Sequence, residues 1–160
     1  MLRATLASLV LLVSGVLFPT LAQSACKDLS TVGVRLVPLS FSIGSALSSL
    51  SDLSNPSGLT PSELTTHMLI KDNVTLATYA LYSVQVLLRL QASMKLTADA
   101  TLIGETLDAM GADLIGLLDG QVKSINSLLP IVRSAAFLQQ AMQARDRIIE
   151  VSWLFRTKCA

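Results

Sequence analysis

The two cysteines of this chain constrain its fold most strongly, because they lie near opposite ends of the sequence. Cys26 follows an apolar N-terminal stretch, and Cys159 is the penultimate residue. Thiols pair in an oxidising compartment, so we expect a Cys26–Cys159 disulfide. In the chain-entropy account, closing so long a loop stabilises a fold by about 4 kcal/mol. Two unpaired thiols, or a bridge to another chain, are the alternatives.

The N-terminus has the organisation of a signal peptide. Arg3 supplies a positive charge, residues 6–18 form an apolar core, and Pro19 ends that core just before a group of small residues. The apolar core is short for a bilayer span. We therefore expect residues 1–25 to direct export, and an uncleaved N-terminal anchor is the alternative.

The small residues after the apolar core define the expected cleavage. A cut after Ala22 or after Ser24 places small residues at both positions that the peptidase requires. We expect cleavage between residues 22 and 25, which leaves residues 26–160 as a single helical domain. Lipidation of Cys26 is an alternative, although Gln23 stands where a lipoprotein signal has an apolar residue.

The composition excludes several classes of protein. Removing Arg3 with the leader leaves 11 basic side chains, which balance the 11 acidic ones. A net charge of zero argues against nucleic acid, which requires a basic face, and gives no support for a polybasic membrane-surface mode. We expect no nucleic acid partner and no transmembrane span in the mature chain. With 51% hydrophobic and 14% charged residues, the chain has enough apolar surface to fold.

Beyond the leader, apolar residues recur every three or four positions, which is typical of amphipathic helices. The recurrences predict helices over residues 28–54, 61–70, 74–90, 98–128 and 130–155. A disulfide between the termini requires the chain to begin and end on one side of the domain, so an up-and-down bundle needs an even number of helices. We predict an all-α, antiparallel up-and-down four-helix bundle with an additional short helix over residues 61–70, its termini joined by the disulfide.

Two local signals refine the helix boundaries. Thr60 and Glu63 have the spacing of a capping box around Pro61, which predicts a helix start there. Pro38 lies within the first helical stretch, so we expect a kink there or two shorter helices that meet near Val37.

The same spacing predicts which side chains are buried. Residues 74–90 are apolar on nearly every side, so we expect their helix to be central in the domain. We interpret four aromatic residues as core packing: Tyr79, Tyr82, Trp153 and Phe155. The last helix is expected to bury Ile131, Ala135, Leu138, Met142, Ile149 and Trp153.

Residues 98–128 contain four glycines, each of which destabilises a helix interior by about 1 kcal/mol relative to alanine. Ala112, Gly116 and Gly120 lie four apart and predict the close approach of a neighbouring backbone. A break near Gly120 is the alternative, and we favour one helix. Residues 97–120 carry acids and no base, whereas bases predominate in residues 121–160, so we expect these neighbours to face each other with opposite charge.

The sequence offers little for catalysis. His67 is the only histidine, and we interpret it as a surface or capping residue. Glu63 lies four residues before it, whereas carboxylate-bridged metal bundles use a spacing of three. No phosphate-binding glycine loop or nucleophile motif occurs. We expect no catalytic, cofactor-binding or metal-binding residues.

These observations predict an exported, non-catalytic helical-bundle protein. We expect it to bind a protein partner in the periplasm or outside the cell, as an inhibitor, immunity factor or adaptor does. The first alternative is a carrier of a lipid or another apolar small molecule. The second is an enzyme that uses His67.

Overall fold

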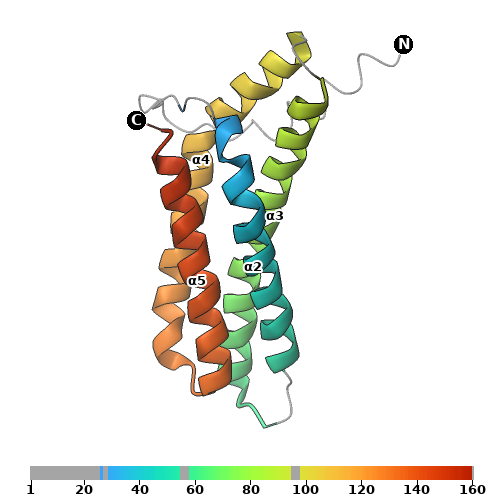
Figure 1. Cartoon of the computed structure of the whole chain (residues 1–160). Helices are drawn as coiled ribbons and strands as arrows, with labels where there is room; N and C mark the ends of the chain where they lie inside the picture. Colours follow the sequence, from blue (N-terminus) through green and yellow to red (C-terminus); the bar gives the residue numbers. More distant parts are fainter. Residues whose placement is uncertain (1–25, 27–28, 55–57, 95–97, 160) are drawn as a thin grey trace, which may run out of the picture.

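A computed structural model describes residues 26, 29–54, 58–94 and 98–159 (Figure 1). The signal peptide expected over residues 1–25, with its cleavage site, lies outside the described residues.

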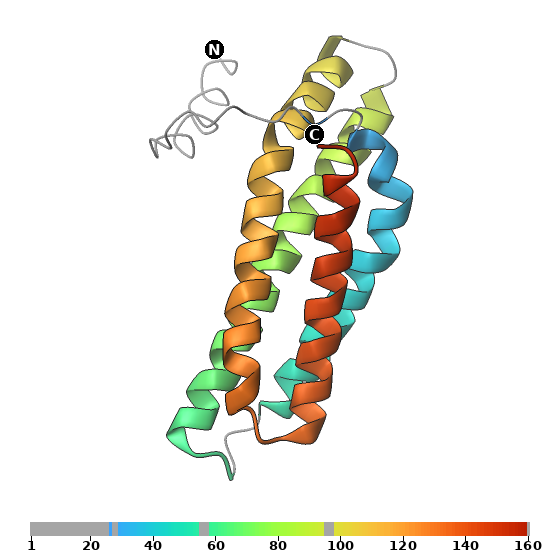
Figure 2. The ribbon, with the colours of Figure 1, turned by 90° about the vertical axis from the view of Figure 1, so that its left-hand side faces the viewer.

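The described part of the chain forms a bundle of four α-helices with two short 3-10 helices. α2 packs against α3 and α5, and α4 also packs against α3 and α5, so neighbours around the bundle follow chain order. Figures 1 and 2 show α2 and α4 running one way along the long axis and α3 and α5 running the other way. The predicted all-α antiparallel four-helix bundle is confirmed. The elements are η1 (Leu29–Val32), α2 (Gly33–Leu53), α3 (Pro61–Met94), α4 (Ala98–Leu128), η2 (Leu129–Ile131) and α5 (Ala135–Arg156).

The sequence predicts a kink at Pro38 or two shorter helices that meet near Val37; α2 passes through Pro38 as one helix, so the second of these outcomes is wrong. Proline removes one backbone hydrogen bond from the helix. Leu36 and Ile43, on either side of it, are fully buried, so both parts of the helix pack in the core. Leu29–Leu53 is also the one described stretch long and apolar enough to cross a membrane.

α3 begins as the capping box predicts. The Thr60 backbone N–H donates to Glu63 Oε2 at 3.0 Å, and the Glu63 N–H donates to Thr60 Oγ1 at 3.3 Å. However, residues 61–70 are the first part of α3 and not a separate short helix. Ile70 and Val74 are fully buried on one face, and this continuous burial carries the helix through residues 71–73.

α3 is not central, contrary to expectation. Each helix of a four-helix bundle has one buried side, and among the described residues no further element covers the outer side of α3. Tyr79 is 67% exposed and Tyr82 is 60% exposed. The interpretation of Tyr79, Tyr82 and Trp153 as core residues is therefore wrong, whereas Phe155 is fully buried.

α4 runs unbroken through Gly120, as we favoured. Leu107, Leu114, Leu118 and Ile125 lie in the core. The close approach predicted along Gly116 and Gly120 is wrong, because a Cβ atom at either position would have no neighbouring atom within 4 Å. Both glycines lie on the outer side of α4, away from its neighbours.

The last helix starts later than Pro130, which lies in η2. Ser134 caps α5, and its side chain accepts a hydrogen bond from the Phe137 N–H at 3.3 Å. The predicted buried face is wrong: Trp153 is 57% exposed, Leu138 is half-buried, and Ile131, Ala135, Met142 and Ile149 are exposed. The true face is rotated about one residue and contains alanines, which let α5 approach its neighbours closely. It consists of Phe137, Ala141, Ala144, Ile148, Val151, Ser152, Leu154 and Phe155.

Opposite charges face each other between α4 and α5, as expected. Asp119 on α4 accepts a hydrogen bond from Ser152 at 2.7 Å and forms an ion pair with Arg156. Arg145 donates to the side chain of Asn126 at 3.2 Å. These polar contacts define how the two helices align along the bundle.

Candidate functional site

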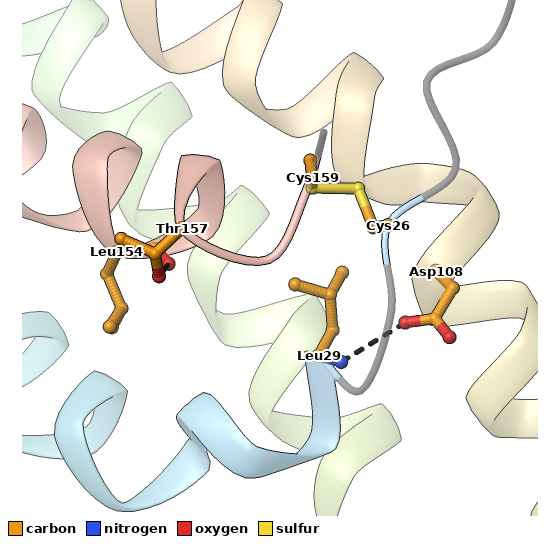
Figure 3. The surroundings of a disulfide bond; sticks show 6 residues. All are labelled: Cys26, Leu29, Asp108, Leu154, Thr157 and Cys159. Carbon is orange, nitrogen blue, oxygen red and sulfur yellow. Dashed lines mark hydrogen bonds between the residues drawn. A yellow bond between two sulfur atoms is a disulfide. The ribbon is translucent and has the colours of Figure 1, made fainter.

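The predicted disulfide joins Cys26 to Cys159 at one end of the bundle (Figure 3). Close by, the Leu29 N–H donates to Asp108 on α4 at 3.1 Å. Gly111 lies almost one turn further along α4, under the disulfide. A Cβ atom there would collide with Cys26 Sγ and would lie 3.1 Å from Cys159 Sγ. Gly111 therefore provides the space into which the disulfide fits.

His67 lies in the core, so its interpretation as a surface or capping residue is wrong. Its side chain is 1% exposed and stacks on Phe137, with ring centroids 3.6 Å apart. Neither Nδ1 nor Nε2 has a hydrogen-bond partner within the described residues. Burial lowers the pKa of His67, and the negative charge of Glu63 opposes this effect. The neutral ring acts as a packing surface between α3 and α5.

Glu63 has a structural role as well. It closes the capping box and lies 3.7 Å from Arg133, the residue before the α5 cap. Hydrogen bonds from Thr60 lower the pKa of Glu63. Among the residues that the structure describes, no group of three or more histidine, cysteine, aspartate or glutamate side chains could hold a metal ion.

The most unusual surface is the outer side of α3. Between Met68 and Leu90, six large apolar side chains are exposed there over a helix length of about 33 Å, and Met94 is exposed further along α3. No charged residue occurs in α3 between Asp72 and Arg89. We call this surface the α3 outer face. It consists of Met68, Leu69, Leu76, Tyr79, Tyr82 and Leu90.

A groove lies beside this face, between the first part of α2 and the last part of α3. Its volume is about 450 Å³, within the range of about 300–1,000 Å³ that is usual for small-molecule sites. Apolar atoms make up most of the surface of its lining, and Arg89 is the one charged residue among the described residues that line it. We call it the α2–α3 groove. Its lining consists of Ser30, Gly33, Val34, Val37, Gln85, Leu88, Arg89, Gln91 and Ala92.

Sequence reasoning missed both surfaces. It assigned Tyr79 and Tyr82 to the core, and it could not bring residues 30–37 together with residues 85–92. The available signal was the long uncharged stretch of α3, which exceeds what one buried helix side requires.

Comparisons with protein-family models, curated proteins and solved structures give no match to this chain. The function therefore has to be inferred from the surfaces of the molecule.

Proposed function

We propose that this protein is an exported, non-catalytic helical-bundle protein that binds a partner protein through the α3 outer face. The observation that carries the proposal is the row of six exposed apolar side chains on α3, whose central part, between Asp72 and Arg89, has no charged residue. Contiguous apolar patches on a folded domain mark interaction surfaces, because leaving them in water is unfavourable.

The arrangement of the α3 outer face resembles a protein interface more than a random patch. Tyr79 and Tyr82 lie near its middle, and tyrosine is enriched among the residues that dominate binding energy. Asp72 and Arg89 flank the central part of the face, which contains Leu76, Tyr79 and Tyr82, as polar residues flank the centre of an interface; Met68, Leu69 and Leu90 lie outside these two charges. A protein partner with an apolar centre and a polar rim would match this pattern.

The non-catalytic part of the proposal rests on His67. A histidine that is 1% exposed and stacked on Phe137 has no access to a substrate. The disulfide is consistent with export into an oxidising compartment, which is the periplasm or the exterior of the cell. Inhibitors, immunity factors and adaptors of such compartments act by binding alone.

Paired surface variants test the partner surface. We would purify the protein from its own envelope or medium with bound proteins, and compare wild type with the double variant Tyr79→Lys, Tyr82→Lys. Both side chains are exposed, so the fold should persist. The matched control adds the same charge on α5 through Gln139→Lys and Gln143→Lys, which are also exposed.

The expected result is one protein, in fixed ratio, that accompanies wild type and the α5 control but is lost from the α3 variant. Retention by the α3 variant, or equal loss from both variants, would contradict the proposal.

The α2–α3 groove favours a second candidate function, a carrier of an apolar small molecule. Its volume and apolar lining suit a small ligand, and it lies at a different position from the middle of the α3 outer face.

A further inference from the structure

The floor of the α2–α3 groove is open and apolar. Leu88 of α3 lies opposite Gly33 of α2, and a Cβ atom on Gly33 would only reach ordinary contact with Leu88 Cδ1 at 3.5 Å. Val34 and Val37 line the α2 side. With no side chain at Gly33, a narrow apolar group can lie against both helices.

One end of the groove is polar. Ser30 and Gln91 line it there, and Arg89 lies nearer the middle of the groove, next to Leu88. Gln91 donates weakly to the Ala100 carbonyl at 3.4 Å. Arg89 takes part in none of the ion pairs formed by the described residues, whereas Arg133, Arg145, Arg147 and Arg156 each have an acidic partner. The Arg89 guanidinium, which forms no ion pair with a described residue, therefore lies beside the apolar part of the α2–α3 groove.

The other end continues toward two exposed aromatic rings. Val37 and Gln85 line the groove together. Phe41 lies one turn beyond Val37, and Tyr82 lies almost one turn before Gln85. Since α2 and α3 run in opposite directions, both steps lead the same way along the bundle, by about 6 Å and 4.5 Å. The helix spacing therefore indicates that Phe41, which is 79% exposed, and Tyr82 lie near this end of the groove, although neither belongs to its lining.

We propose that the α2–α3 groove binds a single-chain anionic amphiphile, with its anionic head group on Arg89 and its alkyl chain running over Leu88 and Val37 toward Phe41 and Tyr82. A guanidinium binds a carboxylate or phosphate through paired, charge-assisted hydrogen bonds. The apolar floor shields the chain from water. This inference rests on the carrier function proposed above and specifies its ligand; Tyr82 belongs both to the α3 outer face and to the expected path of the alkyl chain.

The test measures binding of purified, disulfide-bonded full-length protein to dodecanoate, tetradecanoate and hexadecanoate below their micelle concentrations. Burial of each additional methylene should tighten binding up to about fourfold, until the chain outgrows the groove. Methyl tetradecanoate has the same chain without the charge, and it should bind at least about tenfold more weakly than tetradecanoate. The affinity for hexadecanoyl lysophosphatidylglycerol is compared with that for hexadecanoate. The tighter binder shows whether the ligand is a lysophospholipid or a free fatty acid.

Three variants locate the site. Arg89→Gln should weaken the binding of tetradecanoate at least about tenfold and leave the binding of the methyl ester unchanged. Arg35→Gln is the control, because Arg35 is exposed on α2, has no ion pair among the described residues and does not line the groove. Gly33→Phe should fill the groove and abolish binding of every chain. If Gly33→Phe fails to fold, Val37→Trp serves the same purpose from a half-exposed position.

Three results would overturn the inference. Equal binding of acid and methyl ester, unaffected by Arg89→Gln, would leave an apolar carrier without anion selectivity. Binding unaffected by Gly33→Phe or Val37→Trp would place the ligand elsewhere. If the protein floats with phosphatidylglycerol vesicles but shows no saturable binding of any soluble probe, it binds a membrane surface and not a single amphiphile.

Discussion

The two halves of the bundle differ in how they use polar side chains. Between α4 and α5, Asp119, Ser152 and Arg156 form contacts across the helix interface. Within the described residues, no hydrogen bond joins α2 to α3. Their hydroxyl groups donate to carbonyl groups of the same helix, as Ser40 does to Leu36.

This difference in hydrogen bonding gives the two halves different surfaces. A hydroxyl that is bonded to its own helix has less capacity to bind water or a polar partner. The α2–α3 half therefore presents an apolar exterior with few charges, which suits binding, whereas the α4–α5 half fixes helix alignment through charge and the disulfide region.

The largest expected effect comes from the disulfide that joins the termini above α4. The double variant Cys26→Ser, Cys159→Ser should lose about 2–5 kcal/mol of unfolding free energy, since the unfolded chain regains its freedom. Urea denaturation checks this value. If the variant is as stable as wild type, the disulfide does not anchor this end of the bundle.

Two glycines on α4 sharpen the contrast between its inner and outer sides. Gly111→Ala places a methyl group against the disulfide and should destabilise the fold by about 1–3 kcal/mol. Gly116→Ala meets no atom and should stabilise it by about 1 kcal/mol through helix propensity. Thermal unfolding of both variants measures the difference, and the same sign for both would contradict the packing under the disulfide.

His67 tests the contact between the halves, because it stacks on Phe137 across α3 and α5. Its pKa is lowered in the fold from the ordinary value of 6.5. The unfolded chain thus binds a proton first as the pH falls, and the unfolding free energy should decrease below about pH 6.5 by at most about 1.4 kcal/mol per pH unit. Above pH 7 this contribution is constant.

The measurement is urea denaturation between pH 5 and 8, a range above the titration of Glu63, whose pKa is lowered from 4.5. In the variant His67→Phe the decline in stability below pH 6.5 should disappear. An unchanged decline in that variant would assign the pH dependence to other groups.

The smallest effect compares single polar contacts in the two halves. Asp119→Ala removes the acceptor that joins α4 to α5 and should destabilise the fold by about 1 kcal/mol, less at high salt. Thr78→Ala removes a hydroxyl that donates only to the Val74 carbonyl of α3, and its effect should be close to zero. Equal losses of unfolding free energy in the two variants, measured by urea denaturation, would contradict the difference between the two halves.

The sequence predicted features that depend on neighbouring residues or on the number of residues of one type. The Thr60–Glu63 capping box depends on neighbouring residues, and the pairing of Cys26 with Cys159 depends on there being two cysteines. The buried face of α5 could not be predicted, because two apolar stripes compete at helical spacing. The stripe that includes Met142 and Trp153 stays exposed, and the buried stripe combines Ala141 and Ala144 with the large rings of Phe137 and Phe155.

The candidate sites were harder to predict because they join residues distant in the chain. Burial of His67 depends on Phe137, and the groove depends on Gly33 and Leu88 meeting. Periodicity assigns each residue to a side of its own helix but does not identify what lies opposite. The exposed position of Tyr79 follows from the number of helices that surround α3.

Site-specific photocrosslinking tests the central claim, that the α3 outer face is the interaction surface, most directly. A photoreactive phenylalanine analogue at position 79 is irradiated in the native envelope or medium and compared with the same analogue at position 139 on α5. We predict a discrete crosslinked protein from position 79 and none from position 139. No crosslink at position 79, or the same product from both positions, would contradict the account.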